Sequence, residues 1–114
     1  MHVDQEKDPQ LPLELSHRVL DAGGAAVEIG GELDVATADA AFGYVSEIID
    51  RCGGPVVVCV AGVRFWDARG LYALVRMSHH AQRADCRFRV ISPGPRLTQL
   101  MQITGLGETF LAAS

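Results

Sequence analysis

The chain has 114 residues, enough for one domain with a single hydrophobic core. Hydrophobic residues make up 48% of it and charged residues 21%, which is the composition of an ordinary globular protein. No apolar run approaches the roughly 18 residues of a membrane span, and the polar, acidic segment 1–8 is unlike a signal peptide, so we expect a cytoplasmic protein without a membrane partner.

The net charge of −4 hides an asymmetry between the two halves of the chain. Residues 1–50 carry eleven acidic residues against Lys7 and Arg18, whereas the remaining residues carry three acidic residues against eight arginines. The acidic first half argues against direct nucleic-acid binding, and few aromatic residues accompany the arginines for stacking on bases.

The chain has three cysteines, Cys52, Cys59 and Cys86, and none of them forms a CxxC pair. The odd number argues against a disulfide framework. We interpret them as reduced thiols that pack as small hydrophobic side chains. The alternative is a redox pair such as Cys59 with Cys86, which requires the two strands that carry them to be neighbours.

The first elements predicted along the chain are a tail and a hairpin. Residues 1–10 show no periodicity and end in Asp8-Pro9, so we expect a flexible N-terminal tail followed by one folded domain over residues 11–114. Residues 11–20 and 25–31 are predicted to be strands. The turn cluster 21–24 between them favours an antiparallel hairpin.

A helix is predicted next, because apolar residues from Ala38 to Cys52 recur at the i, i+3, i+4, i+7 spacing of one helix face. Thr37 is the expected N-cap and Gly53 the expected stop. Pro55 then prevents the helix from continuing.

The second half alternates strands and helices. Residues 56–60 are predicted to form a buried strand, and a second helix follows Asp67. Residues 86–91 are predicted to form the next strand. A third helix has Pro95 in its first turn and ends at Gly105.

Residues 108–113 are a possible short edge strand. The predicted order is therefore β-β-α-β-α-β-α, which indicates an α/β domain with a small mixed sheet of four to five strands and about three helices. Alternating strands and helices imply right-handed parallel crossovers. In such sheets the working surface lies at the carboxyl ends of the strands. Here that end carries the predicted loops 31–34 and 63–70.

These two loops carry a resemblance to a known family. The chain has Gly31-Glu32-Leu33-Asp34 after a strand, then a helix and a buried strand, then Gly62-Val63-Arg64-Phe65-Trp66-Asp67-Ala68-Arg69-Gly70-Leu71. Pro93-Gly94-Pro95 and Thr104-Gly105-Leu106 follow at the spacing of a final helix. In this order the segments resemble the STAS domain family, which includes bacterial anti-sigma factor antagonists. The likeness covers residues 11–112 and implies a STAS-like fold.

The resemblance implies a phosphorylation switch that this chain lacks. In the family, the segment Asp67-Ala68-Arg69-Gly70 would read Asp-Ser-Ser-Gly or Asp-Ser-Thr-Gly. The partner is an anti-sigma factor that is also a serine kinase of the GHKL ATPase type. The unphosphorylated antagonist binds this kinase and thereby frees the sigma factor. Phosphorylation of the second hydroxyl by the kinase breaks the complex. Because Ala68 and Arg69 occupy the two hydroxyl positions, we expect no phosphorylation there. Cys59 also departs from the family, since relatives often have aspartate at its position.

The resemblance places a docking surface for the partner around the two loops. Arg69, Arg76 and Arg83 are spaced by seven residues and therefore share a helix face, which His79, His80 and Arg64 extend. This basic stripe predicts an acidic partner surface and salt-sensitive association. The predicted partner-binding residues are Glu32, Asp34, Arg64, Trp66, Asp67, Ala68, Arg69, Gly70, Tyr72 and Arg76.

Asp67 has a structural interpretation as well, as the N-cap of the second helix. Asp34 and Asp67 are expected at the same strand ends and could form a pair of carboxylates. The sequence offers no nucleophile or base beside them, so we do not interpret them as catalytic. Two other hydroxyls have structural explanations, since Thr37 is the expected cap of the first helix and Ser78 falls on the inner face of the second.

No motif of catalysis or of metal binding stands out. His79 and His80 point about 100° apart around a helix, so both do not easily face one ion. Phosphate-binding and hydrolase motifs are absent from the sequence. We therefore predict a protein that is not an enzyme and has no cofactor and no metal.

Three functions remain open. The chain is an antagonist that binds a kinase-type anti-sigma factor and affects sigma-factor-dependent transcription, an accessory subunit that docks on an ABC transporter ATPase, or a decoy or scaffold for the anti-sigma kinase. Its oligomeric state, monomer or homodimer, stays open.

Overall fold

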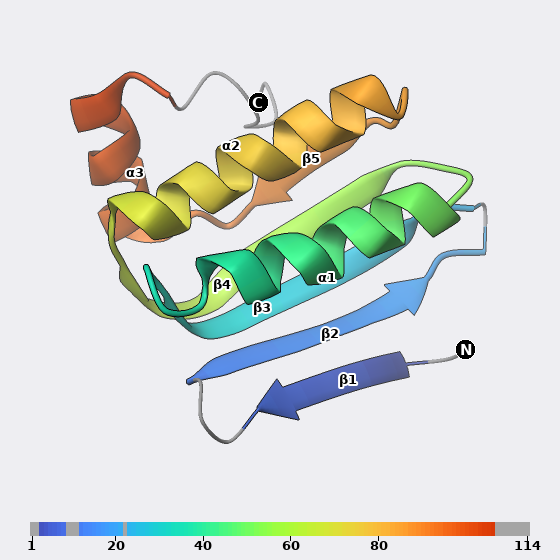
Figure 1. The fold of residues 1–114 in the computed structure, drawn as a ribbon, viewed down its shortest axis with the longest axis horizontal. Coiled ribbons are helices and arrows are strands. Elements are labelled where there is room, and N and C mark those ends of the chain that lie inside the picture. Colours follow the sequence, from blue (N-terminus) through green and yellow to red (C-terminus); the bar gives the residue numbers. More distant parts are fainter. Residues whose placement is uncertain (1–2, 9–11, 22, 107–114) are drawn as a thin grey trace.

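A computed structural model of the chain describes residues 3–8, 12–21 and 23–106. Within these residues it contains a mixed five-stranded sheet and three helices. In chain order the elements are β1 (Val3–Asp8), β2 (Leu13–Val19), β3 (Ala25–Leu33), α1 (Ala38–Arg51), β4 (Val56–Trp66), α2 (Ala68–Arg83), β5 (Phe88–Ile91) and α3 (Gly94–Thr104) (Figure 1).

The strands follow one another across the sheet in the order β1-β2-β3-β4-β5. The pairs β1–β2 and β2–β3 are antiparallel, whereas β3–β4 and β4–β5 are parallel. Each parallel pair is joined through a helix, as the alternation of elements predicts. The predicted α/β class, the hairpin and the order of the elements from β2 to α3 are confirmed.

Residues 3–8 differ from the prediction, which assigned them to a flexible tail. They form β1, which pairs with β2 from Val3 opposite Arg18 to Asp8 opposite Leu13. Periodicity did not indicate this strand because an edge strand is held by backbone hydrogen bonds on one side only and needs no buried stripe. The prediction of a tail without regular structure is therefore wrong at these residues.

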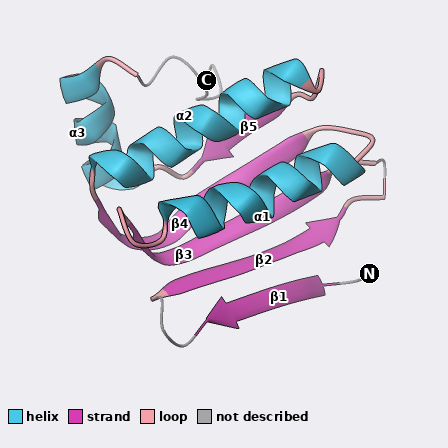
Figure 2. Cartoon of the chain, in the orientation of Figure 1, coloured by secondary structure: helices cyan, strands magenta, loops and turns pink. Residues whose placement is uncertain are grey.

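The helices α1 and α2 cover one face of the sheet, and α3 lies beside the start of α2 (Figure 2). Burial alternates along the central strands, so that Val27 and Ile29 of β3 and Val56 and Val58 of β4 face the helices. The apolar stripes of α1 and α2, from Ala41 to Ile49 and from Leu71 to Ala81, close the core from the other side. None of the described helices is long and apolar enough to cross a membrane.

The strand β4 runs to Trp66, although the sequence predicts that it ends at Val60. Its register against β3 shifts twice, between Glu28 and Gly30 and again between Gly31 and Glu32, and β4 holds one extra residue at each shift. Such bulges break the strict alternation that identifies a strand in a sequence. Residues 63–66, predicted as loop, are therefore part of the sheet.

The helix ends mostly follow the prediction. The helix α1 begins after Thr37 and ends before Gly53, α2 begins after Asp67, and α3 has Pro95 in its first turn and Gly105 at its end. The strand β5 begins at Phe88, two residues later than predicted. The possible strand at 108–113 lies outside the described residues.

Candidate functional site

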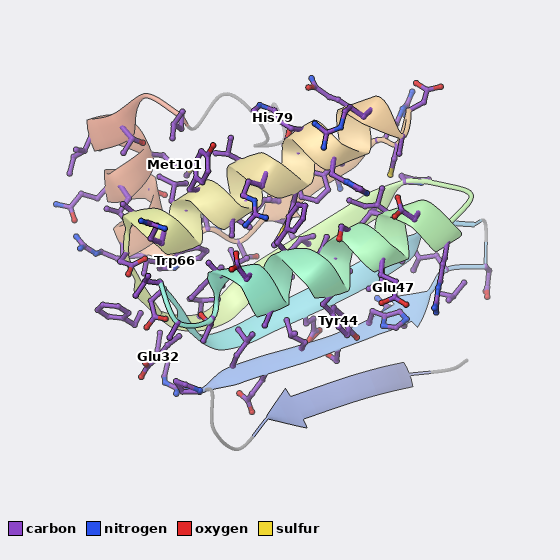
Figure 3. All side chains as sticks on the ribbon, in the orientation of Figure 1. Glu32, Tyr44, Glu47, Trp66, His79 and Met101 are labelled. Atoms are coloured by element: carbon purple, nitrogen blue, oxygen red, sulfur yellow. The ribbon has the colours of Figure 1, made fainter. Side chains whose placement is uncertain are left out.

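The two loops predicted to form the working surface meet at the carboxyl ends of β3 and β4, where α1 and α2 begin (Figure 1). Parallel pairing sets Glu32 opposite Phe65 and Leu33 opposite Trp66 at this end. Figure 3 shows Glu32 and Trp66 there, whereas Glu47 lies toward the far end of α1. The sheet therefore brings together the segments that the sequence singled out.

Asp67 joins the two loops through its carboxylate. Its Oδ1 accepts a hydrogen bond from the backbone N–H of Gly70 at 2.9 Å, which caps α2 as predicted. Its Oδ2 accepts from the backbone N–H of Val35, in the other loop, at 3.1 Å. One side chain thus fixes both the start of α2 and the position of the β3–α1 loop. This second bond was not predicted from the sequence.

The β3–α1 loop is also held from within, by Asp34 and Thr37. The Asp34 Oδ1 accepts from the backbone N–H of Ala36 at 2.9 Å. The hydroxyl of the buried Thr37 donates to the carbonyl of Glu32 at 2.8 Å and accepts from the N–H of Asp34 at 2.9 Å. Thr37 therefore occupies the predicted cap position without capping α1 by its side chain, and it ties the loop back to β3 instead.

Two residues predicted to bind the partner are buried. Trp66 is only 3% exposed and belongs to the core. Gly70 is buried where the first turn of α2 crosses the end of β3, and a Cβ at this position would overlap the carbonyl oxygen of Leu33. Both residues shape the surface from below, so we remove them from the set that can contact a partner.

Exposed apolar side chains lie at this same end of the molecule. Val35 in the first loop is 66% exposed, Phe65 at the end of β4 is 49% exposed and Tyr72 in α2 is 55% exposed. Val35 and Phe65 are not among the residues predicted from the sequence to bind the partner, because the resemblance directs attention to the hydroxyl positions of the family. The signal that could have found them is an apolar residue in each of two segments predicted to be loops.

Arg64, Ala68 and Arg69 are exposed beside these apolar residues. Within the described part of the chain, neither arginine lies within ion-pair distance of an acidic side chain. We call the six exposed side chains at or next to the linked loops the end-loop surface: Val35, Arg64, Phe65, Ala68, Arg69 and Tyr72. The predicted residues Glu32, Asp34 and Asp67 are half-buried beneath it.

Arg76 belongs to a different contact. Its guanidinium lies 2.9 Å from the carboxylate of Asp39 and 4.1 Å from the centre of the Phe42 ring, both in α1. His80 likewise lies 2.8 Å from Asp50 of α1. The predicted basic stripe along α2 is therefore interrupted, because two of its members contact the acidic side chains of the neighbouring helix.

The two adjacent histidines of α2 lie in different surroundings. His79 is exposed while His80 is directed toward Asp50. No group of three or more potential metal ligands is found in the described residues. The carboxylates of Asp34 and Asp67 both accept hydrogen bonds from backbone N–H groups.

Comparison with known proteins identifies the family. The model of the STAS domain matches residues 16–113, so the chain belongs to the STAS domain family. No curated protein matches the chain.

Solved structures share the fold at low identity. An anti-sigma factor antagonist from Mycobacterium paratuberculosis is 22% identical, with a TM-score of 0.71 over 96% of this chain and 92% of that one. The antagonist SpoIIAA of Bacillus, in its unphosphorylated form, is 17% identical with a TM-score of 0.69 over 88% of each chain. The murine anion transporter Slc26a9 is 17% identical with a TM-score of 0.61, over 75% of this chain and 14% of the transporter.

Proposed function

We propose that the protein is a non-catalytic regulator that binds a serine-kinase-type anti-sigma factor through the end-loop surface and antagonises it. It acts in the cytoplasm of a bacterium and affects sigma-factor-dependent transcription. Because its loop carries no acceptor hydroxyl, phosphorylation at this position does not switch it off. The observation that carries the proposal is the exposed pair Ala68 and Arg69 at the start of α2, where the family has its hydroxyls.

Exposed apolar residues support a protein partner. Large apolar side chains that gather on one part of a surface mark interaction sites more often than isolated ones do. Val35, Phe65 and Tyr72 supply such side chains on the β3–α1 loop, β4 and α2 respectively. Aromatic and arginine side chains are the residue types enriched at the energetic centres of interfaces. We therefore expect Phe65 to insert into an apolar pocket of the partner.

The charged residues beside these apolar side chains indicate which charges the partner carries around its pocket. Arg64 and Arg69 are exposed and form no ion pair with an acidic side chain among the described residues. A partner with carboxylates around its apolar pocket would complement them. Arg69 also stands in the first turn of α2, where a cation opposes the helix dipole by about 0.3–1 kcal/mol. Binding to a carboxylate would relieve that cost.

The first experiment identifies the partner and measures its dependence on Phe65. The protein is used to capture partners from a lysate of its source organism, and the captured protein is purified and titrated by calorimetry. We expect a GHKL-type ATPase whose affinity falls at least about tenfold with Phe65→Ala, the loss of one central aromatic contact. The matched control is Val19→Ala, because Val19 is a strand residue of comparable exposure (59%, against 49% for Phe65) at the opposite end of the sheet.

The second experiment tests the missing switch. The purified kinase and Mg-ATP are incubated with the wild type and with Arg69→Ser, and the intact masses are compared. We expect no phosphoryl group on the wild type and one on the variant, because the substitution restores a hydroxyl at the family's position. A phosphoryl group on the wild type, or a partner that is bound equally well by Phe65→Ala, would overturn the proposal.

The other functions are distinct outcomes of the same experiments. Capture of a transporter ATPase would favour an accessory role, and part of an anion transporter shares the fold of this chain. A kinase that binds the protein but keeps its sigma factor would indicate a decoy or scaffold. Release of sigma factor in a three-component binding assay distinguishes antagonism from that case.

A further inference from the structure

A second feature lies at the opposite end of the sheet from the end-loop surface. There the α1–β4 and α2–β5 loops run side by side, joined by a hydrogen bond from the N–H of Val56 to the carbonyl of Arg87 at 2.8 Å. Between the loops lies a cavity of about 290 Å³. Two of the three cysteines, Cys52 and Cys86, line it together.

Both thiols are held in place by the ends of the helices that precede them. Cys52 caps the end of α1, and its N–H donates to the carbonyl of Ile48 at 2.9 Å. The N–H of Cys86 donates to the carbonyl of Ala81, in the last turns of α2, at 2.8 Å. The Cys86 thiol points toward the other loop, because its Sγ lies 3.6 Å from the carbonyl oxygen of Gly54. Both cysteines are half-buried rather than sealed in the core.

The surroundings of Cys86 shift the ionisation of its thiol. Burial is the largest cause that raises the pKa of the Cys86 thiol, and the neighbouring Cys52 is the second, because two thiolates repel each other. A hydrogen bond with the backbone of Val56 opposes the shift.

Cys59 is excluded from this pair, although the sequence suggested Cys59 with Cys86 as the redox alternative. Cys59 is paired in register with Ile91 of β5 and with Glu28 of β3, within the sheet rather than at its end. It lines a different groove, with Glu14 and Ser16 of β2. The neighbour of Cys86 is therefore Cys52, from the loop before β4.

We propose that Cys52 and Cys86 form a reversible intramolecular disulfide when the protein meets hydrogen peroxide. Nothing in the proposed function requires this bond, so the two proposals can fail separately. The pair lies at the amino ends of β4 and β5, whereas the end-loop surface lies at the carboxyl ends of β3 and β4.

The reaction takes two steps that balance. The Cys52 thiolate attacks one oxygen of the peroxide, the O–O bond breaks, and hydroxide leaves, so that Cys52 becomes a sulfenic acid. The Cys86 thiolate then attacks the Cys52 sulfur and displaces hydroxide. In sum, two thiols and one peroxide give one disulfide and two waters. Cys86 takes the second role, because its raised pKa lowers its thiolate fraction at neutral pH.

The bond would link α1 to α2 through the loops that follow them. Positions 52 and 86 close a loop of about 34 residues, and such a cross-link stabilises mainly by restricting the unfolded chain. Gly53 follows Cys52 in open space, so the loop has room for the small adjustment that disulfide geometry requires. We expect the oxidised protein to melt roughly 10 °C higher than the reduced protein.

The test treats the full-length, reduced protein with hydrogen peroxide and then counts free thiols. We expect two of the three thiols to disappear, no disulfide to form between two chains, and dithiothreitol to restore both thiols. Peptide mapping by mass spectrometry without reduction should recover a peptide that joins Cys52 to Cys86. This direct map on the wild type does not depend on whether any variant folds.

Three single variants make the assignment specific. Cys59→Ser should still lose both of its thiols and gain the same thermal stability. Cys52→Ser and Cys86→Ser should gain none. A linked peptide that contains Cys59, oxidation that gives only dimers, or an unchanged melting temperature in the oxidised wild type would overturn the proposal.

Discussion

Gly70 illustrates how one residue sets the geometry of the proposed docking surface. The helix α2 starts directly above the end of β3, and Gly70 is the point of closest approach, because a Cβ there would meet the Leu33 carbonyl oxygen. Its N–H also donates to Asp67. A side chain at this position would push the start of α2, and with it Ala68 and Arg69, away from the sheet.

We therefore expect Gly70→Ala to lower the free energy of unfolding by roughly 1–3 kcal/mol, the usual cost of overfilling a close-packed site. Urea unfolding followed by circular dichroism measures the change. The matched control is Gly43→Ala, because Gly43 lies within α1 with open space around its Cα. Alanine there should stabilise the protein by about 0.5–1 kcal/mol. Equal effects of the two substitutions would contradict the close contact.

Asp67 caps α2 and holds the β3–α1 loop through two hydrogen bonds. Two variants distinguish the contribution of these hydrogen bonds from that of the negative charge. Asp67→Ala removes the cap of α2 and the bond to Val35, and should cost about 1–2 kcal/mol of unfolding free energy. Asp67→Asn keeps an acceptor oxygen for the cap and should cost less. If urea unfolding gave the same loss for both variants, the charge rather than the hydrogen bonds would be responsible.

Among the elements, the strands and helices with strong periodicity were predictable and the irregular ones were not. The stripe from Ala38 to Cys52 identified α1 to within one residue of its observed end, because a buried helix face must repeat every three to four residues. The strand β1 and the bulged end of β4 were not predicted, because neither segment shows a regular alternation of apolar and polar residues in the sequence.

The candidate site was predictable to a similar degree. The order of elements placed both loops at one end, and Asp67 was identified as a cap, because these features follow from local sequence. The burial of Trp66 and the contact of Arg76 with α1 depend on tertiary packing. The even spacing of Arg69, Arg76 and Arg83 gave no sign that the middle arginine contacts another helix.

The contact between α1 and α2 supplies the next prediction. Arg76 lies over the Phe42 ring and beside Asp39, whose side chain is 95% exposed. Such an exposed ion pair contributes little, so we expect Asp39→Ala to cost less than about 0.5 kcal/mol of unfolding free energy. Arg76→Ala removes the stacking as well and should cost about 1 kcal/mol. A double-mutant cycle of Arg76→Ala with Phe42→Leu, measured by urea unfolding, would show no interaction energy if the stacking were unimportant.

In the molecule as a whole, folding brings acidic residues of the first half of the chain next to basic residues of the second half. The acidic α1 and the basic α2 lie side by side, where Asp39 meets Arg76 and Asp50 meets His80 (Figure 1). Arg69 and Arg83, near the two ends of α2, remain exposed and form no ion pair among the described residues. Only Arg69 of these two lies at the end-loop surface, so the long stripe predicted from the sequence reduces to a local positive charge beside Phe65.

This arrangement allows a charge-matched test of where the partner binds. Arg69→Glu and Arg83→Glu make the same change in net charge on the same helix, about 21 Å apart along its axis. That separation exceeds the screening length of about 8 Å at physiological ionic strength. We therefore expect Arg69→Glu to weaken binding to the captured kinase about fivefold, mostly through slower association, and Arg83→Glu to leave it nearly unchanged. Surface plasmon resonance at low and high salt measures both rate constants. The difference between the variants should shrink as salt is raised, because screening acts on the local charge. Equal weakening by both variants would instead indicate an effect of net charge and would move the docking surface away from the end of the sheet.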